Sequence, residues 1–296
     1  MEWYIYALLA PAFWALNNVF IKFLITKKFK TYVPMISTII LMDMPFAVAT
    51  LMIVPINFHF PNTIIAIIVG LFPLLAFWFY SKALLVEEVS RIITLFQLIP
   101  VFVALLSAVF LSEILGPQKY LGIIIIVVSS MLISYKKTKG KTSFSSAFKY
   151  MIPFGLIIAV YTILEKILLS YFEFWSLFFW SVTGALLGVI LLLAFKKPRK
   201  QFTKTIPTIG KKGLLLTFIS EGIYVTGALF SLIALSSTDA SIASALFGLQ
   251  PFYIFFYTLF LSVFLPKFLT EDLNKQTIIL KISAITLMFT GTYLIV

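Results

Sequence analysis

Stretches of apolar positions, each about as long as a membrane span, follow one another along this chain. Long apolar stretches are separated by short breaks that hold charged residues, proline, asparagine or glycine. A helix needs about 20 mostly apolar residues to cross some 30 Å of hydrocarbon. Ten stretches meet this requirement, and the predicted spans are 3–25, 32–54, 64–85, 92–112, 117–135, 148–170, 174–195, 213–236, 240–265 and 276–296.

This pattern predicts an all-α polytopic membrane protein, because backbone groups in lipid must hydrogen-bond within their own segment. The composition agrees: 61% of the residues are hydrophobic, only 11% are charged, and the mean hydropathy is +1.07. A globular protein carries roughly 25% charged residues. The loops are short, so no soluble catalytic module is expected. The longest two, 136–149 and 196–212, are basic.

The net charge of +12 reflects the distribution of lysine and arginine over these loops. The loops after the odd-numbered spans, together with the span ends that flank them, carry 19 of the 23 basic residues, and the opposite loops carry only Lys119. By the positive-inside rule, the odd-numbered loops are expected to be cytoplasmic and both termini outside, in the plasma membrane. Basic residues placed this way set orientation, so nucleic acid is not an expected partner.

The two halves of the chain share a sequence pattern. A shift of 151 residues places Pro100 on Pro251 within an ungapped window of seven identities, 83–102. A weaker match at 144 places Lys22 on Lys166. We therefore expect two five-helix repeats, 1–140 and 141–296. Five is an odd number, so the second repeat must cross the membrane inverted, as in carriers that alternate access around a site at the membrane midplane.

Several of these residues resemble a known family. Trp14-Ala15-Leu16-Asn17 through Lys22, the run from Ala83-Leu84 to Ser90, residues 98–106 and Leu111-Ser112-Glu113 resemble the EamA-type members of the drug/metabolite transporter superfamily. The resemblance implies ten helices built as five plus five that carry small metabolites. The chain departs from the family pattern at Ala15 and Asp43, and it has Phe264 where the second half would place a partner of Glu113.

Ionisable residues inside spans are costly and indicate function. At 1.5 Å per residue, Asp43 and Glu221 lie about 16 and 12 Å from the basic face, so both are predicted to bind solute in a shared cavity. Each carboxyl could instead be buried neutral or bonded to a neighbouring helix. Lys22 and Glu165 are candidate gating or coupling residues. Lys166 is expected to snorkel outward to the interface.

Neutral polar and aromatic side chains complete the predicted site. The amides Asn17, Gln97 and Gln250 are candidate solute ligands, although amides in spans also join helices. Pro100 and Pro251 are expected to break their helices beside the site. Aromatic rings next to a carboxyl group suit an organic cation, and the candidates are Trp78, Tyr161 and Tyr224.

The chain has no cysteine, a single histidine (His59) and no glycine-rich phosphate loop. We therefore predict neither an enzyme nor an ATP-driven pump, and no metal or cofactor. The leading hypothesis is a secondary carrier for a small polar or amphipathic metabolite, with a bias towards zwitterionic or cationic solutes such as amino acids or amines, and with proton coupling open. The alternatives are an intramembrane lipid-processing or lipid-translocating protein and a channel. The expected partners are the solute and the bilayer, and the protein is a monomer or a homodimer.

Overall fold

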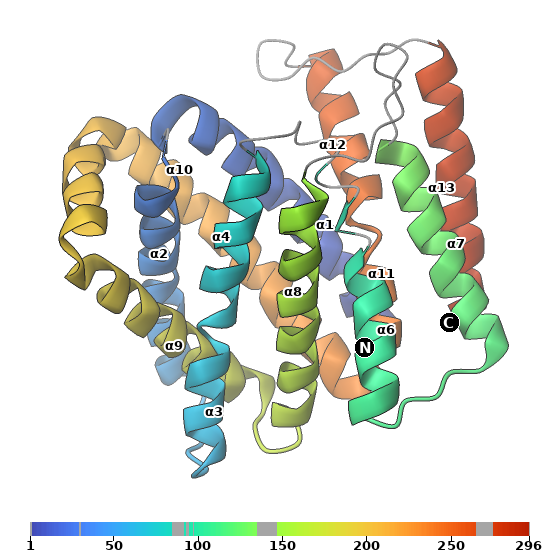
Figure 1. The fold of residues 1–296 in the computed structure, drawn as a ribbon, viewed down its shortest axis with the longest axis horizontal. Coiled ribbons are helices and arrows are strands. Elements are labelled where there is room, and N and C mark those ends of the chain that lie inside the picture. Colours follow the sequence, from blue (N-terminus) through green and yellow to red (C-terminus); the bar gives the residue numbers. More distant parts are fainter. Residues whose placement is uncertain are drawn as a thin grey trace.

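The structure is a computed structural model that describes residues 2–29, 31–84, 92, 95–96, 98–134, 147–264 and 275–295. Within these ranges the regular elements are all helices (Figure 1). In the first half they are α1 (Trp3–Leu24), the π-helical turn η1 (Ile25–Phe29), α2 (Tyr32–Ile53), α3 (Asn62–Val69), α4 (Phe72–Leu84), α6 (Leu98–Phe110) and α7 (Pro117–Ser134). In the second half they are α8 (Phe148–Leu168), α9 (Phe174–Ala194), α10 (Lys196–Ser237), α11 (Ala240–Phe247), α12 (Gln250–Phe264) and α13 (Lys275–Ile295).

These helices fall on the predicted spans, so the all-helical membrane fold is confirmed. Seven helical stretches of the described chain are long and apolar enough to cross a bilayer: 3–21, 32–53, 62–83, 148–168, 174–194, 196–237 and 240–257. Two shorter apolar helices, Leu98–Phe110 and Pro117–Ser129, lie between them in the sequence.

Two of the spans are broken near their middle, and proline accounts for both breaks. The third span divides at Gly70 and Leu71, and Pro73 lies in the first turn of α4. The ninth divides at Gly248 and Leu249, and Pro251 lies in the first turn of α12. Proline has no N–H to continue the preceding helix, and its ring clashes with the carbonyl group four residues earlier. In the same way α6 begins at Leu98, two residues before Pro100.

The segment 196–212, which was predicted to be a basic loop, is instead helical. It forms the first part of α10 and meets the membrane-spanning part at Gly210, whose φ of +70° suits glycine best. Ile209 is buried against Leu24, Phe29 and Met35. The loop prediction was wrong because it rested on the lysines of this segment and did not weigh its isoleucines, which fix the segment to the bundle. The other predicted basic loop lies largely outside the described residues.

The helices of the two halves are interleaved. α1 packs mainly against α10, and α4 against α8. α2 contacts both α9 and α10, α6 contacts α8 and α11, and α1 contacts α11 and α12. α7 and α13 lie side by side at one edge of the molecule (Figure 1), where Gly122 and Gly291 bring the two backbones together. Residues of α1, α2, α4, α6 and α8 to α12 line a space between the two halves.

Candidate functional site

A chamber of about 270 Å³ lies between the two halves of the chain. The first half contributes side chains from α1, α2, α4 and α6, and the second half contributes side chains from α8 to α12. Most of the wall is apolar. The polar groups that line it are Asn17, Asn18, Asp43, Tyr80, Tyr161, Thr162, Glu165, Ser181, Glu221, Tyr224, Ser231, Ser244 and Gln250.

Asp43 and Glu221 meet inside this chamber. Asp43 lies on α2 and Glu221 on α10, and their side chains interact directly. The crossing of these helices also stacks Phe46 on Phe218, one turn away from the two carboxyl groups, with ring centroids 5.0 Å apart. Asp43 is 7% exposed and Glu221 1%. Helix packing thus holds two acidic side chains together out of contact with bulk water.

The two carboxyl groups are incompletely satisfied. Among the described residues, Oδ1 of Asp43 and Oε1 of Glu221 have no hydrogen-bond partner. A buried polar atom without a partner is rare in native structures and calls for an explanation. Both atoms belong to residues that line the chamber, so a bound ligand can provide the missing donors.

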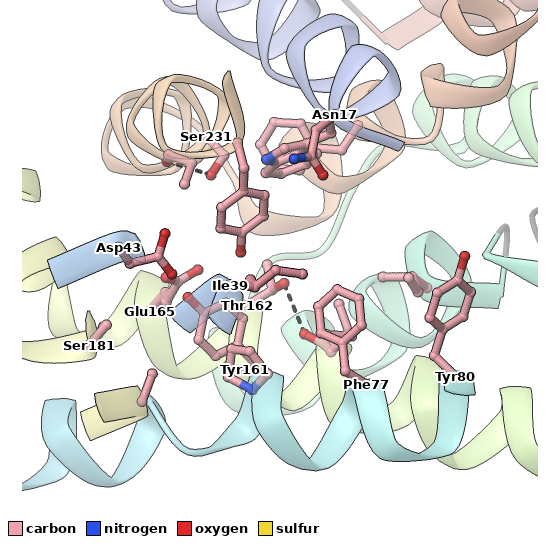
Figure 2. Close-up of a pocket in the computed structure, with 18 of the residues that line it drawn as sticks. Asn17, Ile39, Asp43, Phe77, Tyr80, Tyr161, Thr162, Glu165, Ser181 and Ser231 are labelled. Carbon is pink, nitrogen blue, oxygen red and sulfur yellow. Dashed lines mark hydrogen bonds between the residues drawn. The ribbon is translucent and has the colours of Figure 1, made fainter. Parts of the chain in front are cut away.

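A third carboxyl group, Glu165, lies on α8 in the same chamber. It is 6% exposed and interacts with Tyr161, one helical turn before it. Tyr224 on α10 lies within electrostatic range of all three carboxyl groups. Figure 2 shows Asp43 and Glu165 on one side of the chamber, and Phe77 and Tyr80 on the other. The chamber therefore has an acidic side and an aromatic side.

Asn17 fixes the wall of the chamber. Its amide nitrogen donates to the carbonyl oxygen of Ser220 at 2.8 Å and to the Ser220 hydroxyl oxygen at 2.9 Å. These bonds join α1 to α10 one residue before Glu221, and the Asn17 side chain also interacts with Glu221. The Asn17 amide thus joins α1 to α10 directly beside the acidic pair.

Two charged side chains hold the turn between α10 and α11, close to the end of the chamber at Leu235. The ammonium group of Lys166 donates to the carbonyl oxygens of Leu235 and Thr238, each at 2.7 Å. From the other side, Glu113 accepts hydrogen bonds from the backbone N–H of Ala240 at 2.9 Å and of Ser241 at 3.3 Å. The expectation that Lys166 snorkels outward was therefore wrong, since carbonyl oxygens of the neighbouring helix end lie within its reach.

The structure brings most of the predicted site residues together. Asn17, Asp43, Pro100, Tyr161, Glu165, Glu221, Tyr224 and Gln250 all line the chamber. Trp78 does not, because it is 42% exposed and its ring lies under the Lys82 ammonium group, 3.8 Å from the ring centroid. Pro251 is buried at the start of α12, outside the lining. Gln97 and the side chain of Lys22 lie outside the described residues.

Sequence reasoning missed the small hydroxyl side chains. Ser181, Ser231 and Ser244 line the chamber, and Oγ of Ser181 has no partner among the described residues. Serine is common in membrane helices, so identity alone gives no signal. The useful signal is their position: Ser231 lies on the helix face of α10 that also carries Tyr224 and Ala228.

The described residues contain no group of three or more His, Cys, Asp or Glu side chains arranged to hold a metal ion.

The fold is that of a polytopic helical membrane protein with a chamber between its two halves. The model of the EamA-like transporter family matches residues 1–135, which confirms the resemblance found in the motifs. No curated protein sequence matches the chain. Among 28 chains of solved structures that match is a protein crystal structure with a TM-score of 0.69 and 16% identity, covering 97% of this chain and 95% of that chain. At this identity the similarity shows the fold alone.

Proposed function

We propose that this protein is a secondary carrier that moves a small polar or amphipathic solute by alternating access, with a bias towards cationic or zwitterionic solutes. The observation that carries the proposal is a chamber lined by both halves of the chain, in which Asp43 and Glu221 meet with unpaired oxygen atoms. Enclosed polar groups between two halves are what a carrier needs to hold a solute away from both aqueous phases.

We also propose that the ten predicted spans form two inverted repeats, 1–140 and 141–296. Helix contacts support this proposal. If the two halves are copies of one unit, each helix has a counterpart in the other half. Replacing both helices of a contact by their counterparts must then give another contact that the fold contains. The α1–α10 contact then becomes α8–α4, and α6–α8 becomes α11–α1, while α2–α9 and α7–α13 are their own counterparts. All of these contacts are present in the described part of the chain.

The acidic pair suggests how transport is driven. Two neighbouring carboxylates repel each other, and a positive charge placed between them relieves the repulsion. A protonated solute or a proton supplies such a charge, and exchange of one for the other would couple solute movement to a proton gradient. We therefore propose proton exchange as the driving reaction.

The orientation follows from the basic loops. We propose that the odd-numbered loops face the cytoplasm and that both termini lie outside the plasma membrane. The helical segment at the start of α10 then lies on the cytoplasmic face, where its lysines can contact anionic lipid headgroups. The solute and the bilayer are the partners proposed for this chain, as a monomer or a homodimer.

Transport by the purified protein in proteoliposomes tests the proposal. Counterflow of labelled amines and amino acids is measured for the natural protein and for Asp43→Asn and Glu221→Gln between about pH 5 and 8. We expect saturable counterflow by the natural protein and a loss of at least about tenfold in each variant. Normal transport by both variants across this range would show that the acidic pair is not the solute site.

A further inference from the structure

Four buried side-chain atoms of residues that line the chamber have no partner among the described residues: Oδ1 of Asp43, Oε1 of Glu221, Oγ of Ser181 and Nε1 of Trp14. Oδ1 of Asp43 and Oε1 of Glu221 are buried acceptors without a partner among the described residues. When the pair is ionised, both unpaired oxygen atoms can only accept hydrogen bonds, so only a donor on the ligand can satisfy them. A ligand bound here therefore has to bring N–H or O–H groups to this position.

The charge of the lining narrows the ligand further. Asp43, Glu165 and Glu221 place three carboxyl groups in the chamber, and none of the lining residues that the structure describes is lysine, arginine or histidine. Lys166 follows Glu165 directly in the sequence, but its ammonium group is bound to Leu235 and Thr238. A carboxylate on the solute would lie beside three acidic side chains, with no described basic side chain to receive it.

The number of donors separates the classes of cation. A primary ammonium group carries three N–H donors, enough for both unpaired oxygens and for a third acceptor. A quaternary ammonium group carries the same charge but no donor, so it would leave both acceptors unsatisfied. Charge alone thus does not meet the requirement of the site.

The rest of the chamber describes the body of the ligand. Trp14 and Phe247 pack edge to face, with ring centroids 5.3 Å apart, and both line the chamber together with Ile36 and Ile99. Apolar walls of this kind favour a hydrocarbon or aryl body through burial of its surface.

Building on the proposed carrier function, we propose that the solute is a primary aliphatic or aryl-alkyl amine without a carboxylate. Its ammonium group donates hydrogen bonds to Asp43 and Glu221, and its apolar body lies against the aromatic and isoleucine side chains of the chamber. Amino acids and quaternary ammonium compounds are poor ligands for the same site.

Four probes that share one phenyl body test this specificity on the purified full chain. They are 2-phenylethylamine, L-phenylalanine, the N,N,N-trimethyl derivative of 2-phenylethylamine and 3-phenylpropionate, and their binding is measured by calorimetry and by thermal unfolding. We expect 2-phenylethylamine to bind at least about tenfold more tightly than each of the others. Equal or tighter binding of any of the other three, or no binding of 2-phenylethylamine, would overturn the proposal.

Variants assign the binding to the acidic pair. Asp43→Asn and Glu221→Gln are expected to weaken amine binding at least about tenfold. Glu173→Gln, an exposed carboxyl group at the start of α9, should bind as the natural protein does. Asp43→Glu keeps the charge and should retain more affinity than Asp43→Asn. Its retained binding would also show that a substitution at this position leaves the protein folded. Unchanged affinity in both Asp43→Asn and Glu221→Gln would contradict the assignment.

Counterflow with the same probes separates this inference from the carrier function. Binding of 2-phenylethylamine without any counterflow would support the amine site and contradict the carrier. Counterflow of L-phenylalanine in preference to the amine would support the carrier and contradict the amine site.

Discussion

The carboxyl groups of Asp43 and Glu221 meet at the contact between α2 and α10, although 178 residues separate them in the sequence. Each belongs to a different half of the chain, and each keeps one oxygen atom without a partner among the described residues. Breaking a buried polar cluster normally destabilises a protein. Here the cluster already lacks hydrogen-bond partners when no ligand is bound. A substitution in it is therefore expected to affect binding and transport before it affects stability.

Because the two carboxyl groups act on one ligand, their substitutions should not add. Asp43→Asn and Glu221→Gln are each expected to lower transport by at least about tenfold, which corresponds to about 1.4 kcal/mol. The double variant is expected to be no more than about threefold worse than either single variant, as for residues that work as one unit. Initial rates of counterflow for the four proteins measure this coupling. A double variant whose loss equals the product of the single losses would show that the two groups act independently.

Tyr224 and Trp78 were both predicted to bind solute, and the structure separates them. Tyr224 lies near all three carboxyl groups, whereas Trp78 is exposed beside Lys82. Tyr224→Phe removes one hydroxyl donor, worth about 0.5–1.5 kcal/mol, so it should raise the half-saturating solute concentration roughly threefold to tenfold. Trp78→Phe should leave that concentration unchanged. The reverse order of effects would place the solute site on the face of α4 that carries Trp78.

Lys166 should contribute to stability, because it satisfies carbonyl oxygens at the end of α10. Lys166→Met keeps the aliphatic stem and removes two charge-assisted hydrogen bonds, which is expected to lower the free energy of unfolding by about 1–3 kcal/mol. Denaturant unfolding in detergent measures the change. Lys200→Met, at an exposed position of the basic segment of α10, is the control and should unfold as the natural protein does. Equal stability of the two variants would mean that Lys166 is not needed at this turn.

Gly184 allows α9 to touch the end of α3. A Cβ atom at position 184 would overlap the carbonyl oxygen of Ile67, and one at Gly70 would overlap the carbonyl oxygen of Ser181. Gly184→Ala is therefore expected to cost about 1–3 kcal/mol of stability by pushing the two backbones apart. Gly116→Ala is the control, because a Cβ atom there meets nothing within 4 Å. Thermal unfolding of both variants, followed by circular dichroism, distinguishes them.

The hydrophobic pattern predicted the helices well because lipid imposes one requirement on every span. The starts of α2, α7, α8 and α9 coincide with the starts of their predicted spans. The break at Gly70 was not predicted, since the apolar run continues through it and only Pro73 indicates an interruption. The helix over 196–212 was missed for a related reason: a basic helix on a membrane surface lacks the continuous apolar run that identifies a span.

The charged residues of the candidate site could be predicted from the sequence, but the hydrogen-bond partners around it could not. Asp43 and Glu221 were expected in one cavity because both lie at mid-depth, and both line the chamber. The bond of Asn17 to Ser220 and that of Glu113 to Ser241 join residues 203 and 128 positions apart. Such partners depend on how the two halves interleave, and a single sequence does not contain that information.

Cysteine accessibility along α10 tests alternating access most directly, because the natural chain contains no cysteine. Three single variants place a thiol on this helix: Thr203→Cys in the basic segment, Ser231→Cys in the chamber and Ser236→Cys in the last turn. Each is labelled in vesicles with a membrane-impermeant maleimide, added to one side at a time. We expect Thr203→Cys to react from the basic side only and Ser236→Cys from the opposite side only. Ser231→Cys is expected to react from both sides, with solute slowing the reaction. Labelling of Ser231→Cys from one side alone under every condition would contradict a carrier that opens its chamber alternately to the two faces of the membrane.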